Sequence, residues 1–164
     1  MKKILYLFVA FMAFGSGSFA ATIARSVTAT SGSLTMTKTT NEYLSSPPTY
    51  ELITLVWTSD ASGNATVTVP NVIGEIRRIV TNPSDGATSP TADYDVTLKD
   101  ADAVDVMVGQ GANLSQSANK SFYGVTTDAI SSQYIPITVY GDLSLAVTNA
   151  GNAKKGTIKL YLRK

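Results

Sequence analysis

The sequence contains no cysteine and no histidine in its 164 residues, and these two absences exclude most enzyme chemistry. Cysteine nucleophiles, Ser-His-Asp triads and imidazole general bases all need one of the two side chains. The familiar zinc and copper sites need them as well. What remains is a pair of carboxylates acting as acid and base, as in glycosidases, or the binding of hard cations through oxygen ligands.

A long apolar run is also missing. The longest stretch, residues 4–14, has eleven apolar residues, whereas a membrane-spanning helix needs about 20. This stretch follows Lys2 and Lys3 and leads into small residues that end at Ala20, which is the three-part pattern of an export signal. We predict a cleavable signal peptide at residues 1–20, with cleavage after Ala20. The alternative is that residues 4–14 are retained as a membrane anchor.

Charge is scarce, because Asp, Glu, Lys and Arg make up only 15% of the chain. Without residues 1–20, eleven Lys and Arg face twelve Asp and Glu. The basic pairs at 77–78 and 154–155 place at most one charge on each face of a strand. We therefore predict no nucleic-acid partner.

The 144 residues that remain are enough for one domain with a packed core that needs neither disulfides nor metal.

What the chain does contain is alternation. Short segments rich in Val, Ile, Thr and Tyr recur between turn residues, as in antiparallel β-proteins. They lie at 26–31, 33–39, 50–57, 64–69, 74–81, 93–99, 103–108, 134–140, 143–149 and 156–162. The pattern predicts an all-β fold of about ten strands, arranged as a single antiparallel β-sandwich of the jelly-roll or immunoglobulin-like kind.

The predicted domain organisation has three parts. The signal peptide at 1–20 is followed by a Thr/Ser-rich arm or hairpin at 21–48 and by the sandwich at 49–164. Pro47 and Pro48 mark the boundary, because proline interrupts regular strand pairing. Residues 110–132 lack periodic apolar positions, so we expect one long loop there, and long loops often carry function.

The densest acidic cluster consists of Asp93, Asp95, Asp100, Asp102 and Asp105. A calcium site would need such carboxylates, but the cluster lacks the central glycine and the closing glutamate of an EF-hand loop. We predict instead a hairpin over 93–108 in which the aspartates face solvent or form the turn. Its buried face would carry Tyr94, Val96 and Leu98. Whether the segment 93–105 binds an ion is left open, and we assign no metal, cofactor or catalytic residue.

Trp57, the single tryptophan, shares one face of its strand with Ile53 and Leu55. This position predicts a core residue. The alternative is an exposed indole that stacks on a sugar ring. On that alternative, Trp57 and Tyr123 are the candidate ligand contacts.

Several phrases carry a resemblance to a known class of proteins. They are VWTSDASGNAT at 56–66, GEIRRIVTNPSDGATSPTADYDVTLKDADAVDVMVG at 74–109, GANLS at 111–115 and YGDLSLAVTNAGNAKKGTIKLYLR at 140–163. Together they resemble small β-sandwich proteins encoded among the virion genes of tailed bacteriophages. The resemblance covers residues 56–163. It implies a structural role on or near the particle and supplies no catalytic residues.

These observations predict a non-enzymatic protein that acts by surface contact, most simply a phage virion structural or decoration protein. Its expected partners are capsid or tail subunits and further copies of itself, for example in a trimer. The alternative is an exported bacterial module or adhesin subunit that binds a cell-surface glycan or protein through the loop 110–132 and Trp57. A carboxylate-dependent glycoside hydrolase comes third. The expected location is the virion, or the periplasm or exterior of the cell if the signal is used.

Overall fold

The computed structural model describes residues 19–26, 29–42, 50–123, 125–127 and 134–164. These residues form ten β-strands and one turn of 3-10 helix, η1 (Gly86–Thr88). The strands are β1 (Phe19–Ser26), β2 (Ala29–Ser31), β3 (Ser33–Glu42), β4 (Tyr50–Thr58), β5 (Ala65–Pro83), β6 (Asp95–Lys99), β7 (Lys120–Phe122), β8 (Val125–Thr127), β9 (Tyr134–Thr148) and β10 (Lys155–Arg163). The prediction of an all-β protein is confirmed.

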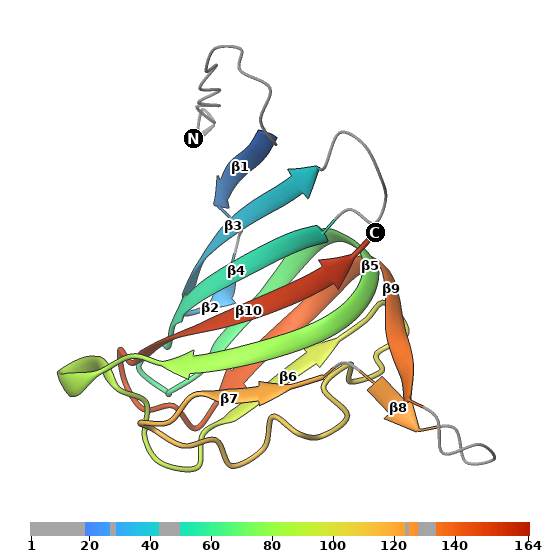
Figure 1. Ribbon diagram of the computed structural model, residues 1–164. Helices are drawn as coiled ribbons and strands as arrows, with labels where there is room; N and C mark the ends of the chain where they lie inside the picture. Colours follow the sequence, from blue (N-terminus) through green and yellow to red (C-terminus); the bar gives the residue numbers. More distant parts are fainter. Residues whose placement is uncertain (1–18, 27–28, 43–49, 124, 128–133) are drawn as a thin grey trace.

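The strands form one antiparallel sheet in the order β1-β3-β4-β10-β5-β9-β6 (Figure 1). Three short strands attach to it, since β2 and β7 pair with β5, and β8 pairs with β9. Because backbone pairing runs without a break from β1 to β6, a jelly-roll or immunoglobulin-like sandwich of two separate sheets is not confirmed.

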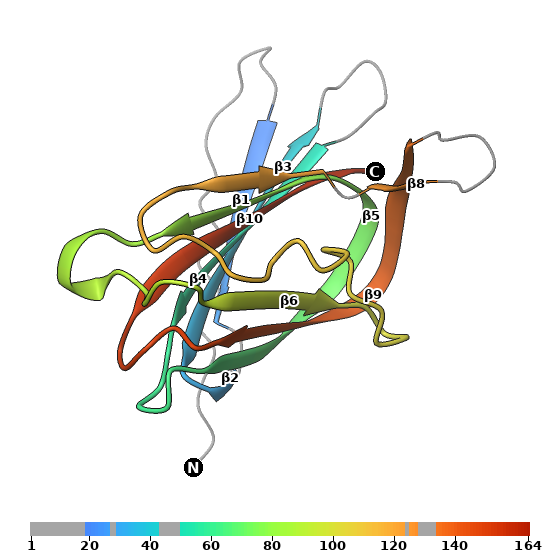
Figure 2. The ribbon, with the colours of Figure 1, turned by 90° about the horizontal axis from the view of Figure 1, so that it is seen from below.

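The sheet folds over itself because β5 and β9 bend together. The first half of β5 lies between β2 and β9, and its second half lies beside β10 and β7. At the bend the pairing shifts between Val69 and Val72, and Asn71 and Gly74 have φ values of 54° and 137°. Gly74 cannot carry a side chain, because a Cβ there would lie 2.6 Å from the carbonyl oxygen of Arg163. The bend brings the two halves of the sheet to face each other (Figure 2).

The core fills the space between these two halves. On β4, Ile53, Leu55 and Trp57 are all buried, whereas Val56 between them is 44% exposed. The alternation predicted for this strand is therefore confirmed. From the other half come buried residues of β5, β6 and β9, among them Val69, Val72, Val96, Leu98, Leu143 and Leu145.

Two pairs of predicted strands each form one continuous strand in the structure. Segments 64–69 and 74–81 are both parts of β5, and segments 134–140 and 143–149 are both parts of β9. Asn71, Gly74 and Gly141 look like turn residues in the sequence. In the structure they bend the strands without ending them, since each has a positive φ inside a paired region.

The strand predicted at 103–108 is wrong, and so is the single loop predicted at 110–132. Residues 106–108 form a turn, and the segment makes only a single bridge, between Lys99 and Asp105. Val106 and Met107 are adjacent and both buried, which a strand could not achieve, because neighbouring side chains on a strand point to opposite faces. Within 110–132 the structure has β7, which pairs with β5, and β8, which pairs with β9.

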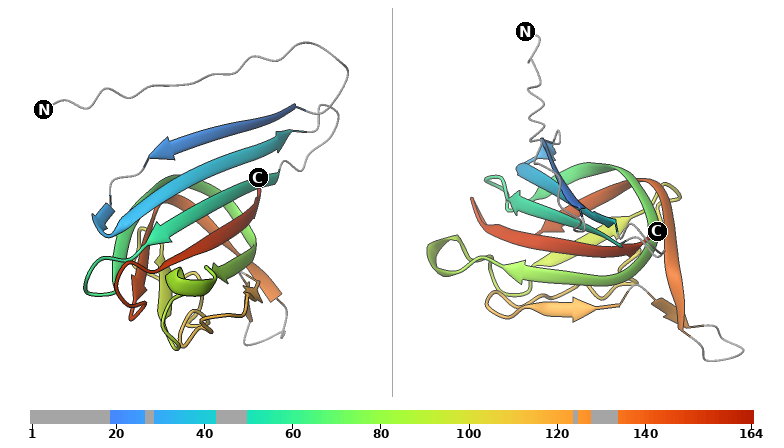
Figure 3. Two further views of the ribbon diagram at one scale, coloured as in Figure 1. Left: turned by 90° about the vertical axis from the view of Figure 1, so that its left-hand side faces the viewer. Right: turned by 45° about the horizontal axis from the view of Figure 1, so that its top comes forward.

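The predicted arm at 21–48 is in part a section of the main sheet. β3 pairs with β4 along nine residues, and Leu34 and Met36 of β3 are buried in the core. β1 pairs with β3 and lies at the outer edge of the sheet (Figure 3). The boundary predicted at Pro47 and Pro48 lies outside the described residues, as does the predicted signal peptide up to residue 18. Phe19 and Ala20 are the first residues of β1, and cleavage after Ala20 stays a prediction.

Candidate functional site

Trp57 does not contribute to a ligand site, because only 1% of it is exposed. Its ring lies 5.9 Å from the ring of Tyr94, centroid to centroid. On the neighbouring strand β10, Gly156 leaves room for the indole, since a Cβ there would lie 2.6 Å from the ring. The sugar-stacking alternative for Trp57 is therefore wrong, and the tryptophan is a core residue.

Tyr94 lies at the same end of the core as Trp57. It is 1% exposed, and burial raises the pKa of its phenol from 10.0 to about 12, because the charged phenolate is poorly solvated there. Val96 and Leu98 are buried on the same face of β6. The prediction that these three residues form the inner face of the acidic segment is confirmed.

Tyr123, the second candidate ligand contact, is 65% exposed and follows the buried Phe122 at the end of β7. The structure therefore does not bring Tyr123 together with Trp57, because one faces solvent and the other faces the core. Tyr123 is available for contact.

Two aspartates of the acidic cluster, Asp100 and Asp105, stabilise turns. Asp105 accepts hydrogen bonds from the backbone N–H groups of Met107 and Gly109, at 3.0 and 2.8 Å. Asp100 accepts from Asp102 and Val104, at 3.0 and 2.9 Å. Asx side chains commonly bind the backbone two residues further on, so these contacts account for the aspartates at these positions.

Asp95 also holds two loops together. Its carboxylate accepts from the backbone N–H of Asn113 and from the side-chain amide of Asn149, both at 2.9 Å. Among the described residues, no group of three or more acidic side chains is arranged to hold a metal ion.

A buried carboxylate lies where β3, β4 and the end of β10 meet. Glu51 is 2% exposed, and Lys38 and Lys164 reach its two oxygens at 3.1 and 2.8 Å. Lys38 also donates to the backbone oxygen of Asn71 in the bend, at 3.3 Å. These contacts join the last residue of the chain and the bend of β5 to the inner face of β4.

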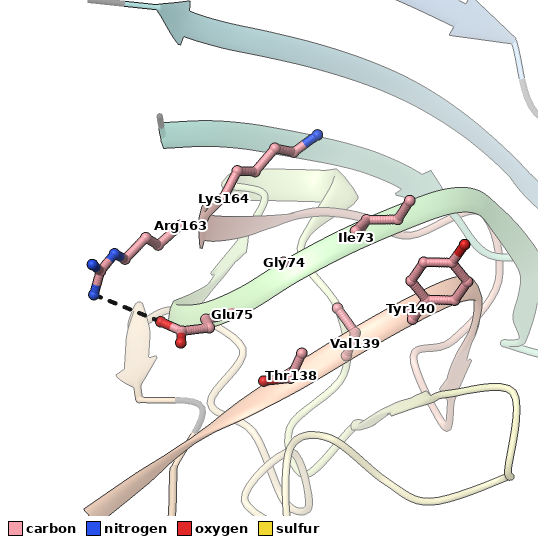
Figure 4. Close-up of a pocket in the computed structure, with 8 residues that line it drawn as sticks. All are labelled: Ile73, Gly74, Glu75, Thr138, Val139, Tyr140, Arg163 and Lys164. Carbon is pink, nitrogen blue, oxygen red and sulfur yellow. Dashed lines mark ion pairs between the residues drawn. The ribbon is translucent and has the colours of Figure 1, made fainter. Parts of the chain in front are cut away.

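Beside this carboxylate is an open groove of about 460 Å³, which we call the corner groove (Figure 4). It is lined by Ile73, Gly74, Glu75, Thr138, Val139, Tyr140, Arg163 and Lys164. Ile73 and Tyr140 are opposite each other in the pairing of β5 and β9 and are 44% and 81% exposed. They form an apolar step on the outer surface of the bend.

Charged side chains border this apolar step. Glu75 binds Arg77 at 2.7 Å, and Arg163 approaches the same carboxylate oxygen only to 3.9 Å. Because Arg77 makes the close ion pair, the guanidinium of Arg163 keeps donors for another acceptor. The groove therefore combines an exposed aromatic ring with a cationic rim, which suits contact with another molecule.

The corner groove was not predicted from the sequence. Tyr140 was one of several scattered tyrosines there, and alternation alone does not show that the sheet bends beside it. The available signals were Gly74 and Gly141, because isolated glycines inside strand patterns often mark bends or bulges.

Comparisons with known proteins add no relative to these observations. No family model matches the chain, and neither the curated proteins nor the solved structures include a significant match. In the described part of the chain, no helix has the length and apolar character needed to cross a membrane.

Proposed function

We propose that the protein is a non-enzymatic structural protein that acts by surface contact, as a component or decoration of a phage particle. The observation that carries the proposal is the position of β1. Among the described residues, β1 has a paired strand on one side only, and its eight residues pair with β3 without a bulge. Such an edge presents free backbone donors and acceptors to a neighbouring chain, and strand addition is a common mode of protein recognition.

The resemblance of residues 56–163 to small virion proteins supports the same proposal. The turn aspartates support the non-enzymatic part of the proposal, because their carboxylates are engaged in hydrogen bonds to the backbone. A decoration protein needs a packed body and a contact edge. The buried core supplies the first, and β1, which is paired on one side only among the described residues, supplies the second. Many weak contacts of this kind add up on a repetitive particle surface.

Intact mass spectrometry of purified phage particles and of host-cell fractions tests the proposal. We expect the chain in particles at a fixed ratio to the capsid protein, and its N-terminal residue would also show whether residues 1–20 are removed. Absence from particles, with the chain found only outside the cytoplasm, would overturn the virion role. That result would favour the alternative, an exported surface-binding module that uses the exposed Tyr123 and Tyr140.

A matched pair of variants tests the role of β1. Adjacent residues of an antiparallel edge strand direct their N–H groups to opposite sides, so one of Ile23→Pro and Ala24→Pro removes a donor to β3 and the other a donor to the open edge. In a co-sedimentation assay with particles, the variant that loses its donor to the open edge should stay folded and lose binding. Wild-type binding by that folded variant would contradict a role for this edge.

A further inference from the structure

The outer face of the central strands is polar and regular. β3, β4, β10, the second half of β5 and β7 lie side by side in the sheet (Figure 1). Residues that pair directly in antiparallel strands share a face, so the register defines a row across these strands. This row consists of Thr37, Thr54, Lys159, Val80 and Ser121, and none of the five is buried. It is roughly 19 Å wide.

Cations recur along the same face of β10. Lys155, Lys159 and Arg163 occupy every fourth position of the strand, and residues separated by an even number of positions point the same way. The Cα atoms of successive cations are therefore roughly 13 Å apart. Arg78 of β5 pairs with Tyr161, two residues from Lys159, and adds a fourth cation to this face. The sheet thus gathers charges that are far apart in the sequence.

Three of these cations have no counter-ion. Within the described part of the chain, Arg78, Lys155 and Lys159 form no ion pair. The acidic residue that the register places on this face is Glu75, which lies opposite Arg163 and is already paired with arginines. The face therefore carries positive charge that the protein itself does not neutralise, and a complementary partner is anionic.

The side chain of Arg78 is held in place on this face. Its Nε donates a hydrogen bond to Oγ of Ser121 at 2.9 Å, and its guanidinium lies 5.3 Å from the centroid of the Tyr161 ring. These contacts leave the two terminal nitrogens as donors. A planar guanidinium that is already oriented can bind a carboxylate through two parallel hydrogen bonds and loses little freedom on binding.

The neutral side chains around the cations favour a sugar polymer over other anions. Thr37 and Thr54 flank Lys159, and their hydroxyls can both donate and accept hydrogen bonds. Threonine is under-represented among the residues that anchor protein interfaces. Single-stranded nucleic acid needs open aromatic rings for base stacking, whereas Arg78 covers the ring of Tyr161.

We propose that this surface, which we call the β10 face and define as Arg78, Lys155, Lys159 and Arg163, binds an acidic polysaccharide through its sugar carboxylates. A linear polymer of sugar acids can lie along β10 and bring a carboxylate to each cation. Each contact is weak on an exposed face, and several together hold the polymer. The inference goes beyond the proposed function, because the β10 face is separated from β1 by β3 and β4.

Binding of the purified full chain to immobilised polygalacturonate, measured by biolayer interferometry, provides the first test. We expect binding to polygalacturonate and none to neutral dextran. The affinity for polygalacturonate should fall as salt is added, because salt screens the attraction between exposed charges. A chain that does not bind polygalacturonate at low salt would overturn the inference.

A matched pair of variants tests the face itself. Lys159→Met should weaken binding by about tenfold, as expected for the loss of one charge-assisted hydrogen bond. The control is Lys99→Met, because Lys99 is an exposed lysine of β6 in the other half of the folded sheet. This control should bind as the wild type does. Equal weakening in the two variants would mean that only the overall charge matters, which contradicts a defined site.

Two conservative variants separate the contact from folding. Lys159→Arg keeps the charge and should retain wild-type binding. Arg78→Lys also keeps the charge but removes the planar guanidinium, so it should weaken binding severalfold. Wild-type binding by both Arg78→Lys and Lys159→Met would overturn the inference.

Single-stranded DNA and vesicles of anionic phospholipid identify the class of partner at the same ionic strength. Weaker binding to both than to polygalacturonate is expected. Tighter binding to either would assign the face to that partner and overturn the inference. All these assays use the free chain, so their outcome is separate from the virion role. A chain found in particles that does not bind polygalacturonate would keep that role and lose only this contact.

Discussion

Trp57 and Tyr140 are two large aromatic residues on strands of the same sheet, and the structure uses them in opposite ways. Trp57 is 1% exposed and packs against Tyr94 and Gly156. Tyr140 is 81% exposed at the bend of β9. The end of the core around Trp57 and Tyr94 is called the closed end below. The difference between the two residues indicates that the closed end supplies stability, whereas the bend supplies accessible surface for contact.

The strongest way to test this division is to truncate Trp57. We expect Trp57→Ala to lower the free energy of unfolding by about 3–5 kcal/mol, because it removes a large buried side chain and leaves a cavity. The control is Val56→Ala on the outer face of the same strand, with an expected change within about 0.5 kcal/mol. Urea denaturation measures both, and a similar small loss in the two variants would contradict a core role for Trp57.

Glu51 lies on the inner face of β4 near its start, and Lys38 and Lys164 form ion pairs with its carboxylate. The double change Lys38→Met and Lys164→Met should destabilise the protein by about 3 kcal/mol, since it removes two cations from a buried carboxylate. Adding Glu51→Gln should restore most of this loss, because the buried charge is gone. Thermal denaturation of the double and triple variants checks the prediction, and a triple variant as unstable as the double would refute it.

Tyr94 makes the closed end sensitive to alkaline pH. Its pKa is about 12 in the folded protein and 10.0 without burial, so the unfolded chain ionises first. The stabilisation is complete below pH 10 and is lost as the pH rises toward 12, by about 2–3 kcal/mol in total. Unfolding free energies measured across this range should fall for the wild type and fall less steeply for Tyr94→Phe. Equal slopes for the two proteins would argue against the buried phenol.

The same two regions show what the sequence could predict. Alternation was sufficient for the closed end, because Ile53, Leu55 and Trp57 on β4 and Tyr94, Val96 and Leu98 on the acidic segment all face the core as expected. Period-two patterns define which residues share a face, and burial of one face then follows.

The bend was not predictable from alternation. Asn71, Gly74 and Gly141 have the composition of turns, and only the pairing of β5 with β9 on both sides of them shows that the strands continue through them. The segment 103–108 failed for a related reason, because backbone hydrogen bonds to Asp105 fold it into turns although its residues have strand propensity. Such local side-chain contacts compete with sheet pairing and leave no periodic signal.

The smallest expected effect on stability is at Tyr140, and it is the most informative for function. Tyr140→Ala should change the free energy of unfolding by no more than about 0.5 kcal/mol, because the ring has little contact with the core. If the bend is a contact surface, the same change should still weaken association with particles, measured by co-sedimentation. Loss of association without loss of stability would separate the two regions cleanly. A loss of stability comparable to that of Trp57→Ala would mean that the bend, too, is part of the packed core.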